Sequence, residues 1–256
     1  MRSRWGKPLT LSYPQLDEPS SPYGEIKREL EEDGVVLLRG FFAPDLYAGW
    51  TQEYLALKGQ IGEPGSPLQR FDRFVSGAIP PPLGAIYQDP KFVALMQSLI
   101  GPDVALYMNR LMVKDQAWSG PVAPHLDLPY FHGGPEKISV FVPLSRQTPE
   151  DGNLYFYRKS HHYGNLGRGG IDVDKFPSLD KFQPDLDVGD IVLMDFCTWH
   201  GSDAPTRQTE RALLQIAFQS AIDGSFQAGS LAAPTLVSGC WQTTYFSAHN
   251  FGITPD

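Results

Sequence analysis

Three side chains in this sequence have the types and the spacing of a metal-binding set. His125 and Asp127 are two residues apart in the stretch 121–131, where the pattern predicts a β-strand. Residues two apart on a strand point to the same face, so that an imidazole nitrogen and a carboxylate oxygen could reach one ion. A second histidine, His200, follows the apolar run 190–196. Two histidines and one carboxylate with open positions are the donor set of a non-haem Fe(II) site.

A fourth residue, Arg211, lies on the apolar stretch 209–218. An arginine on a buried strand needs an anionic partner, and its guanidinium can hold a carboxylate with two parallel hydrogen bonds. A small dicarboxylate, such as a 2-oxo acid, would provide this partner. An internal ion pair with an acidic side chain is the alternative.

The triplet His-x-Asp is a weak signal by itself, because chance produces it often. A lone histidine or aspartate is more often a surface or hydrogen-bonded residue than a metal ligand. Here the triplet opens the β-rich part of the chain, His200 is expected at the end of a strand introduced by the turn 186–190, and Arg211 falls on the next predicted strand. The combination therefore favours a metal site.

The composition limits the class of protein. The chain has 256 residues, of which 41% are hydrophobic and 20% charged, as in ordinary globular domains. A formal net charge of −8 disfavours nucleic acid and anionic membranes as partners. No apolar run approaches a membrane span, and no apolar segment follows the basic N-terminus. Cys197 and Cys240 suggest free thiols more than one disulfide, so we expect a cytoplasmic protein. A small molecule is the default expectation for its substrate.

The predicted elements change character along the chain. Helices are expected over 22–33, 44–58 and 90–100, with a buried strand over 35–42 between the first two. Strands are then expected at 104–114, 121–128, 137–144, 153–158, 190–196 and 210–220. No helix is predicted between these strands, which disfavours a parallel α/β sheet. We predict one domain over 1–256, mainly β with N-terminal helices, in which 103–220 closes as a barrel or jelly roll, 1–102 packs on it and 221–256 wraps around it.

A long segment rich in glycine and proline, residues 59–88, precedes the β region. It carries Arg70 and Arg73 beside two phenylalanines. A loop of this length is usually functional or disordered, so a lid over the site and a passive surface loop are both possible. In the lid interpretation Arg70 contacts the substrate.

Several stretches form a recognisable pattern from about residue 34 to 221. They are 34–42 (GVVLLRGFF), 125–131 (HLDLPYF), 140–144 (VFVPL), 151–154 (DGNL), 159–161 (KSH), 188–193 (VGDIVL), 199–202 (WHGS) and Arg211. Together they resemble the phytanoyl-CoA dioxygenase family, a branch of the Fe(II)/2-oxoglutarate oxygenases. The family's Pro-Gly before Ser-His is replaced here by Arg158 and Lys159. The pattern is specific for the family and does not name a substrate.

This resemblance implies a double-stranded β-helix, a cupin-like jelly roll, with Fe(II) at its open end. It implies 2-oxoglutarate and O2 as cosubstrates, and His125, Asp127 and His200 as the metal ligands, with no further catalytic residue. Arg211 and Ser202 would hold the distal carboxylate of 2-oxoglutarate.

Four more residues are candidate contacts. Phe141 is expected to pack against the cosubstrate, or else in the core. Arg110 lies on the strand where the family places a cosubstrate contact, although a solvated or ion-paired side chain is as plausible. Tyr130 and His132 follow the metal triplet and are candidate substrate contacts, and a surface role fits His132 equally well.

The implied activity is the oxidative decarboxylation of 2-oxoglutarate to succinate and CO2, coupled to hydroxylation of a small molecule. The family's halogenases lack the carboxylate ligand, so Asp127 favours hydroxylation, while desaturation, ring closure and epimerisation stay open. A metal-binding β-barrel sensor or binding protein without turnover is the alternative from another class. Arg211 with Ser202 disfavours it, since such a protein needs no anchor for a 2-oxo acid. The sequence leaves the substrate and the oligomeric state open.

Overall fold

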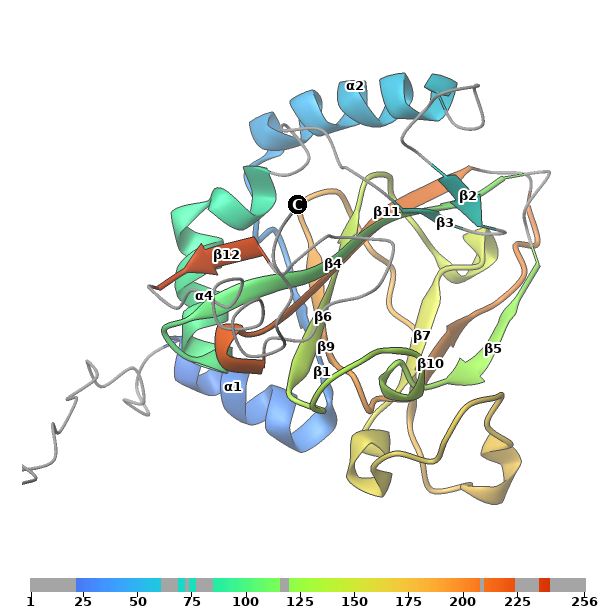
Figure 1. The fold of residues 1–256 in the computed structure, drawn as a ribbon. Helices are drawn as coiled ribbons and strands as arrows, with labels where there is room; N and C mark the ends of the chain where they lie inside the picture. The colour runs from blue at the N-terminus through green and yellow to red at the C-terminus, as the bar shows by residue number, and fades with distance from the viewer. Residues whose placement is uncertain are drawn as a thin grey trace, which may run out of the picture.

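The computed structural model describes residues 22–60, 69–71, 74–76, 85–115, 120–207, 210–223 and 235–239. Its α-helices are α1 (Pro22–Asp33), α2 (Pro44–Gln60) and α4 (Pro90–Ile100) (Figure 1). They match the three predicted helices. Each begins with proline, whose missing N–H is no loss in the first helical turn. At the third helix the Asp89 side chain accepts a hydrogen bond from the Phe92 N–H at 3.0 Å, as a helix cap does.

Two antiparallel sheets form the β part of the molecule. The main sheet runs β1 (Val35–Leu38), β9 (Ile191–Asp195), β6 (Lys137–Pro143), β11 (Arg211–Ser220), β4 (Val104–Lys114), β3 (Phe74–Ser76) and β2 (Gln69–Phe71), with β12 (Thr235–Ser238) also on β4. The smaller sheet runs β5 (Val122–His125), β10 (His200–Ser202), β7 (Leu154–Tyr157) and β8 (Lys181–Phe182). In Figure 1 the smaller sheet lies on the side of the main sheet away from α1 and α4.

Short 3-10 turns connect these elements. They are η1 (Ala85–Gln88), η2 (Leu128–Tyr130), η3 (Pro149–Asp151), η4 (Ser160–Tyr163), η5 (Val173–Lys175) and η6 (Ala221–Asp223).

Alternation along the central strands separates two hydrophobic layers. On β6, Val140 packs in the layer under the helices, with Trp50 and Phe92, whereas Phe141 packs between the sheets with Phe156 of β7. Successive strand residues point to opposite faces, so each central strand serves both layers. The predicted mainly β jelly roll with N-terminal helices is confirmed.

The strand predictions were wrong at two places that matter for the metal set. The strand expected over 121–128 ends at His125, and Asp127 has helical dihedral angles (φ −76°, ψ −36°) just before η2. His200 does not end the strand over 190–196 but begins β10 in the other sheet. The same-face argument for His125 and Asp127 therefore does not describe their actual geometry.

The segment 59–88 is described only in part. Its described strands, β2 and β3, form a hairpin on the edge of the main sheet, where Arg70 pairs with Val75 and Phe74 pairs with Met112 of β4. Arg73 and most of the predicted lid lie outside the described residues, as does most of the predicted wrapping tail. Within the described part of the chain, none of the helices has the length and apolar character needed to cross a membrane.

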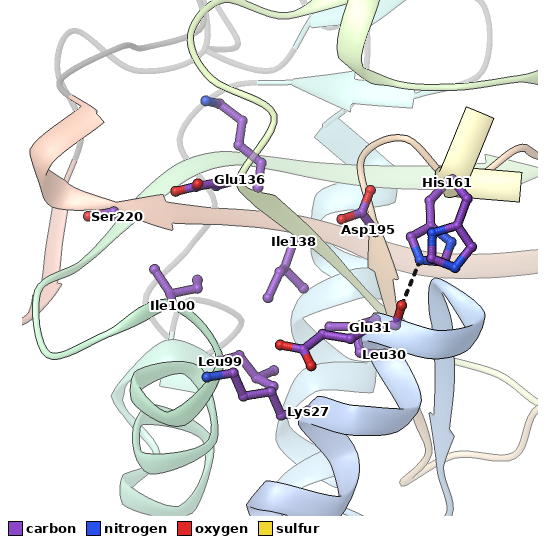
Figure 2. Close-up of a pocket in the computed structure, with 12 residues that line it drawn as sticks. Lys27, Leu30, Glu31, Leu99, Ile100, Glu136, Ile138, His161, Asp195 and Ser220 are labelled. Carbon is purple, nitrogen blue, oxygen red and sulfur yellow. Dashed lines mark hydrogen bonds between the residues drawn. The ribbon is translucent and has the colours of Figure 1, made fainter. Parts of the chain in front are cut away.

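A pocket of about 410 Å³ opens on the helix side of the main sheet (Figure 2). Its apolar lining comes from α1, α4 and β6, and Glu31, Glu136 and Asp195 are among its polar lining residues. Burial raises the pKa of Asp195, and its carboxylate accepts a hydrogen bond from the Cys197 N–H at 2.7 Å. None of the three residues of the metal set lines this pocket. Through its bond to the Cys197 N–H, Asp195 stabilises the turn that leads from β9 to β10.

Candidate metal centre

The structure brings His125, Asp127 and His200 together, with one donor atom of each within 4.8 Å of the others. The Nε2 atoms of both histidines lie 3.8 Å from Asp127 Oδ1. The two imidazole rings have centroids 4.4 Å apart. Two imidazole nitrogens and one carboxylate oxygen thus converge on one point.

Hydrogen bonds to backbone carbonyl oxygens orient both imidazoles. His125 Nδ1 is 2.9 Å from the Ala123 carbonyl oxygen, and His200 Nδ1 is 3.0 Å from the Thr198 carbonyl oxygen. A carbonyl only accepts, so each Nδ1 carries a proton, and in the neutral imidazole Nε2 then has the lone pair that can bind a metal. Such contacts fix the tautomer that a metal requires.

The second oxygen of Asp127 is held from behind by two buried polar side chains. Asp127 Oδ2 accepts hydrogen bonds from Gln215 Nε2 at 3.1 Å and from Ser139 Oγ at 3.4 Å, and these two partners are 3.3 Å apart. Gln215 lies on β11 and Ser139 on β6. The main sheet therefore turns Asp127 Oδ1 toward the histidines, which belong to the smaller sheet. Sequence reasoning missed both residues.

The pairing of short strands sets the spacing of the histidines. In the smaller sheet His200 lies directly opposite His125, with Phe156 on its other side. Beyond it, a Cβ atom on Gly201 would come within 2.4 Å of the Tyr155 hydroxyl and 2.5 Å of the Val122 carbonyl oxygen. Only glycine lets the three strands approach this closely.

The turn that contains Lys159 and Ser160, where the sequence differs from the family pattern, is hydrogen-bonded to the residue before His200. Lys159, in place of the family's glycine, adopts the left-handed conformation with φ 64°. Ser160 Oγ then accepts a hydrogen bond from the Trp199 N–H at 2.8 Å. His161 Nε2 lies 3.0 Å from the Glu31 carbonyl oxygen of α1, which agrees with a structural role for this histidine.

Burial keeps His200 neutral. It lowers the pKa of His200 to about 4, the neighbouring His125 acts in the same direction, and Asp127 and the Thr198 carbonyl oppose the shift. A neutral imidazole is the form that binds a metal. The donor set, its tautomers and its protonation thus fit a divalent ion such as Fe(II).

Two further buried residues have side-chain atoms without hydrogen-bond partners in the described part of the chain. Arg211 is 2% exposed, and its Nε and Nη1 have no hydrogen-bond partner among the described residues; the same holds for the Ser202 Oγ. Arg211 pairs with Lys114 of β4, whose Nζ donates to the Asp203 carbonyl oxygen at 2.5 Å, next to Ser202. The two groups therefore lie at one end of the space between the sheets.

The electrostatics of Arg211 follow from its burial. Burial lowers its pKa to about 10, and the charge of Asp151 opposes that shift. Arg211 is therefore still a cation at neutral pH. A buried cation of this kind needs an anion, and no hydrogen-bonded carboxylate occupies its Nε or Nη1 in the described structure.

The remaining candidates occupy different places. Phe141 is buried, with its ring centroid 6.1 Å from that of His200. Arg110 lies on β4 opposite Gln215, with its Cζ 5.0 Å from the centroid of the Phe131 ring. Burial lowers the pKa of Arg110, and the Asp127 charge opposes this, so Arg110 belongs to the metal end and not to the Arg211 end.

The two aromatic candidates after the triplet differ in position. Tyr130 is 44% exposed and its ring stands edge-on to His125, with centroids 6.2 Å apart. The His132 side chain is exposed, while its N–H donates to the Tyr107 hydroxyl at 2.9 Å. Arg70 lies on β2, at the edge of the main sheet.

The comparison with known families decides the relationship. A family model for phytanoyl-CoA dioxygenase (PhyH) matches residues 30–212. The chain belongs to the phytanoyl-CoA dioxygenase family. The resemblance read from the sequence pattern is confirmed. No curated protein sequence matches this chain.

Solved structures with the same fold come from Fe/2-oxoglutarate enzymes. EctD from S. alaskensis, crystallised with 2-oxoglutarate and 5-hydroxyectoine, has a TM-score of 0.71 and 19% identity, over 88% of this chain and 85% of that chain. The epimerase SnoN, in complex with Fe3+, alpha ketoglutarate and nogalamycin RO, has a TM-score of 0.70 and 17% identity, over 85% and 96%. The carbocyclase SnoK from nogalamycin biosynthesis has a TM-score of 0.63 and 16% identity, over 78% and 84%. At these identities the likeness establishes the fold.

Replacing Gln215 by leucine should weaken metal binding without unfolding the chain. The change removes the 3.1 Å hydrogen bond to Asp127 Oδ2, so the carboxylate loses its orientation. Loss of such a partner typically lowers metal affinity about 10- to 100-fold. Chelator competition measures the Fe(II) dissociation constant. Gln147→Leu is the matched control, because Gln147 is also buried but donates to the Ala212 carbonyl oxygen. Equal losses in both variants would contradict a specific role for Gln215.

The metal-free protein should lose stability as the pH falls from about 6.5 to about 4. The folded-state pKa of His200 is lowered to about 4, so in this window the unfolded chain binds more protons. The contribution of His200 to the free energy of unfolding is complete above the ordinary histidine pKa. It decreases by up to about 3 kcal/mol as the pH falls to about 4. Urea unfolding at several pH values measures it. His200→Gln should flatten the dependence, and an unchanged pH profile in that variant would refute the assignment.

Proposed function

We propose that this protein is an Fe(II)/2-oxoglutarate-dependent dioxygenase that oxidises a small-molecule substrate, by hydroxylation in the first instance. The observation that carries the proposal is the pairing of two features at one site. A set of two histidines and one carboxylate stands in the same space between the sheets as a buried arginine and a buried serine that have hydrogen-bonding atoms without partners in the described part of the chain. A metal-binding protein without turnover needs only the first feature.

The donor set supports iron held through His125, Asp127 and His200. Fe(II) with 2-oxoglutarate supplies the activation of O2 that an unactivated C–H bond requires, while the cosubstrate becomes succinate and CO2. The protein's own groups bind and orient. Three protein ligands leave positions open for the cosubstrate and O2.

The unpartnered groups support a site for the distal carboxylate of 2-oxoglutarate. Arg211 would bind it through its guanidinium, whose Nε and Nη1 have no partner among the described residues, and the Ser202 hydroxyl would donate a further hydrogen bond. Both groups are almost completely buried, so water does not compete for them. Leu213, between Arg211 and Gln215 on β11, and Phe141 on β6 pack together in the layer between the sheets and would border the carbon chain of the cosubstrate.

The opposite end of the space would receive the substrate. Tyr130 and His132 follow the metal triplet, and Arg110 lies beside Phe131 near Asp127. These residues, and Arg70 on the edge hairpin, are our candidate contacts to the substrate or to the inner end of the cosubstrate. Asp127 occupies the carboxylate position that the family's halogenases lack, which favours hydroxylation. Because an epimerase and a carbocyclase have the same fold, epimerisation and ring closure are the other reactions to be tested.

The first test is turnover of 2-oxoglutarate. Purified protein with Fe(II), 2-oxoglutarate and O2 should bind one iron per chain and form succinate, even slowly without its own substrate. His125→Ala and His200→Ala should abolish succinate formation, because two ligands no longer hold the ion. His162→Ala, which changes an exposed histidine outside the set, is the control. Full activity in a ligand variant with its iron content verified would exclude this set.

Arg211→Ala should raise the 2-oxoglutarate requirement greatly, and Arg211→Lys should be intermediate. The first change removes a bidentate charged pair and the second reduces it to a point charge. Loss of such a buried partner typically costs roughly 2–5 kcal/mol. The dependence of succinate formation on 2-oxoglutarate concentration measures the effect. An unchanged apparent affinity would mean that the carboxylate binds elsewhere.

A further inference from the structure

The loop that leads from β10 to Arg211, the first residue of β11, is hydrogen-bonded to the η3 turn (Pro149–Asp151). The Thr206 N–H donates to the Glu150 carbonyl oxygen at 2.9 Å. At Gly152, where φ is +64°, an added Cβ atom would lie 2.4 Å from the Asp203 carbonyl oxygen, so the two backbones approach as closely as glycine allows. The position of the loop before Arg211 thus depends on this turn.

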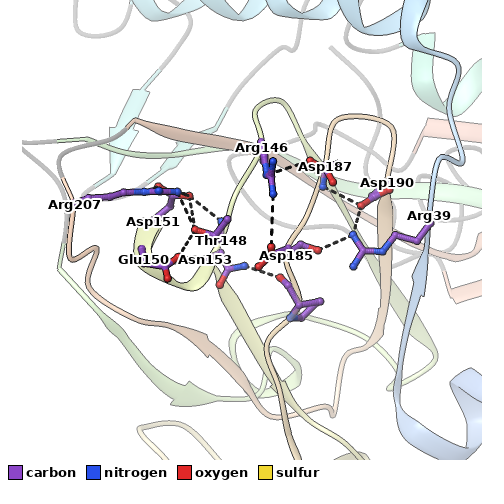
Figure 3. Close-up of polar contacts among 11 residues, drawn as sticks. Arg39, Arg146, Thr148, Glu150, Asp151, Asn153, Asp185, Asp187, Asp190 and Arg207 are labelled. Atoms are coloured by element: carbon purple, nitrogen blue, oxygen red, sulfur yellow. Dashed lines mark hydrogen bonds and ion pairs between the residues drawn. The ribbon is translucent and has the colours of Figure 1, made fainter.

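A buried carboxylate, Asp151, lies at the end of this turn and has both oxygens engaged (Figure 3). Arg207 donates from Nε to Oδ1 at 2.6 Å and from Nη2 to Oδ2 at 2.7 Å. The Thr148 N–H and hydroxyl donate to Oδ2 at 2.8 and 3.0 Å. The Arg207 contact is a bidentate pair between charged groups, the strongest common type of side-chain hydrogen bonding.

The same carboxylate also acts on Arg211. Its charge is the one that opposes the lowering of the Arg211 pKa by burial. Gln147, which lies just before the η3 turn, donates to the Ala212 carbonyl oxygen at 2.8 Å, so this segment is tied to the start of β11. Two arginines therefore interact with one carboxylate. Arg207, whose side chain is 51% exposed, bonds to it directly, whereas the buried Arg211 keeps Nε and Nη1 without partners in the described structure.

Without Arg207, the negative charge of Asp151 would weaken the binding of a dicarboxylate ligand at Arg211. Among the described residues, Thr148 would still donate to Asp151, but the charged partner Arg207 would be gone. The carboxylate would then attract the Arg211 guanidinium more strongly and repel an incoming carboxylate, in a region where water screens little.

We propose that Arg207 is a positioning residue for 2-oxoglutarate, which neutralises Asp151 and thereby reserves the Arg211 guanidinium for the distal carboxylate of the cosubstrate. This inference rests on the proposed role of Arg211. Arg207 touches neither the cosubstrate nor the metal. It acts through Asp151, and its effect is therefore on the affinity for 2-oxoglutarate and not on iron binding or on the maximal rate.

The test is calorimetric titration of 2-oxoglutarate into the Fe(II)-loaded protein without oxygen. Arg207→Ala should weaken binding about tenfold, the size expected for one uncompensated charge in a partly dry site. Adding Asp151→Asn to Arg207→Ala removes that charge and should restore the affinity to within about twofold of the parent protein. Iron affinity and the succinate-forming rate at saturating 2-oxoglutarate should match those of the parent in both variants.

Arg39→Ala is a closely matched control, also drawn in Figure 3. Arg39 is 54% exposed and pairs with the buried Asp190 at 2.7 Å, as Arg207 pairs with Asp151. Asp190, however, belongs to the turn before β9. This variant should lose a comparable surface contact and keep the parent affinity for 2-oxoglutarate.

The outcomes separate this inference from the one it rests on. Parent affinity in Arg207→Ala, with affinity lost in Arg211→Ala, overturns the role of Arg207 alone. Equal losses in the Arg207 and Arg39 variants, or no recovery in the double variant, also overturn it, because a general loosening or another cause would then explain the result. Parent affinity in Arg211→Ala overturns both proposals together.

Discussion

Charge buried between two β-sheets is the constraint on which the site depends. Asp127 and Arg211 are 5% and 2% exposed, and an ion moved from water into such a space is stable only with partners. Asp127 receives hydrogen bonds from Gln215 and Ser139 and faces two imidazoles. Arg211 has incomplete partners within the described chain. This difference between the two charges supports our proposal that a metal binds at the carboxylate and an anionic ligand at the arginine.

In the jelly roll, the smaller sheet carries the two histidines, and the main sheet carries Arg211 and the hydrogen-bond partners of Asp127. The smaller sheet places His125 and His200 opposite each other on short strands, where Gly201 permits the close approach. The main sheet supplies the groups that orient Asp127 and carries Arg211 on the same long strand as Gln215. The metal set exists only where the sheets meet, so that the fold and the site are parts of one arrangement.

The sequence singled out the candidate residues of this site, but it did not predict their geometry. His125, Asp127, His200 and Arg211 stand out because few roles suit such side chains beside apolar strands. The helical turn at Asp127 and the three-residue strand at His200 were not predicted, because neither is long enough to show a period. The long strand over 104–114 was predicted to the residue.

The supporting residues could not be predicted for a different reason. Gln215 and Ser139 are ordinary polar residues on otherwise apolar strands, and their partner Asp127 is far away in the chain. Only the register between β6 and β11, and the turn that carries Asp127, bring them together. Strand alternation was the signal in the sequence that could have found them. A polar side chain on the inward face of a buried strand indicates a nearby buried polar or charged group that needs a hydrogen-bond partner.

The most direct measurement is a crystal structure of the protein with Mn(II) in place of Fe(II) and with 2-oxoglutarate, in which anomalous scattering locates the metal. We expect one peak bonded to His125 Nε2, His200 Nε2 and Asp127 Oδ1, with the distal carboxylate of 2-oxoglutarate on Arg211 and Ser202. A metal peak away from these three atoms, or a distal carboxylate that leaves Arg211 without a partner, would contradict it.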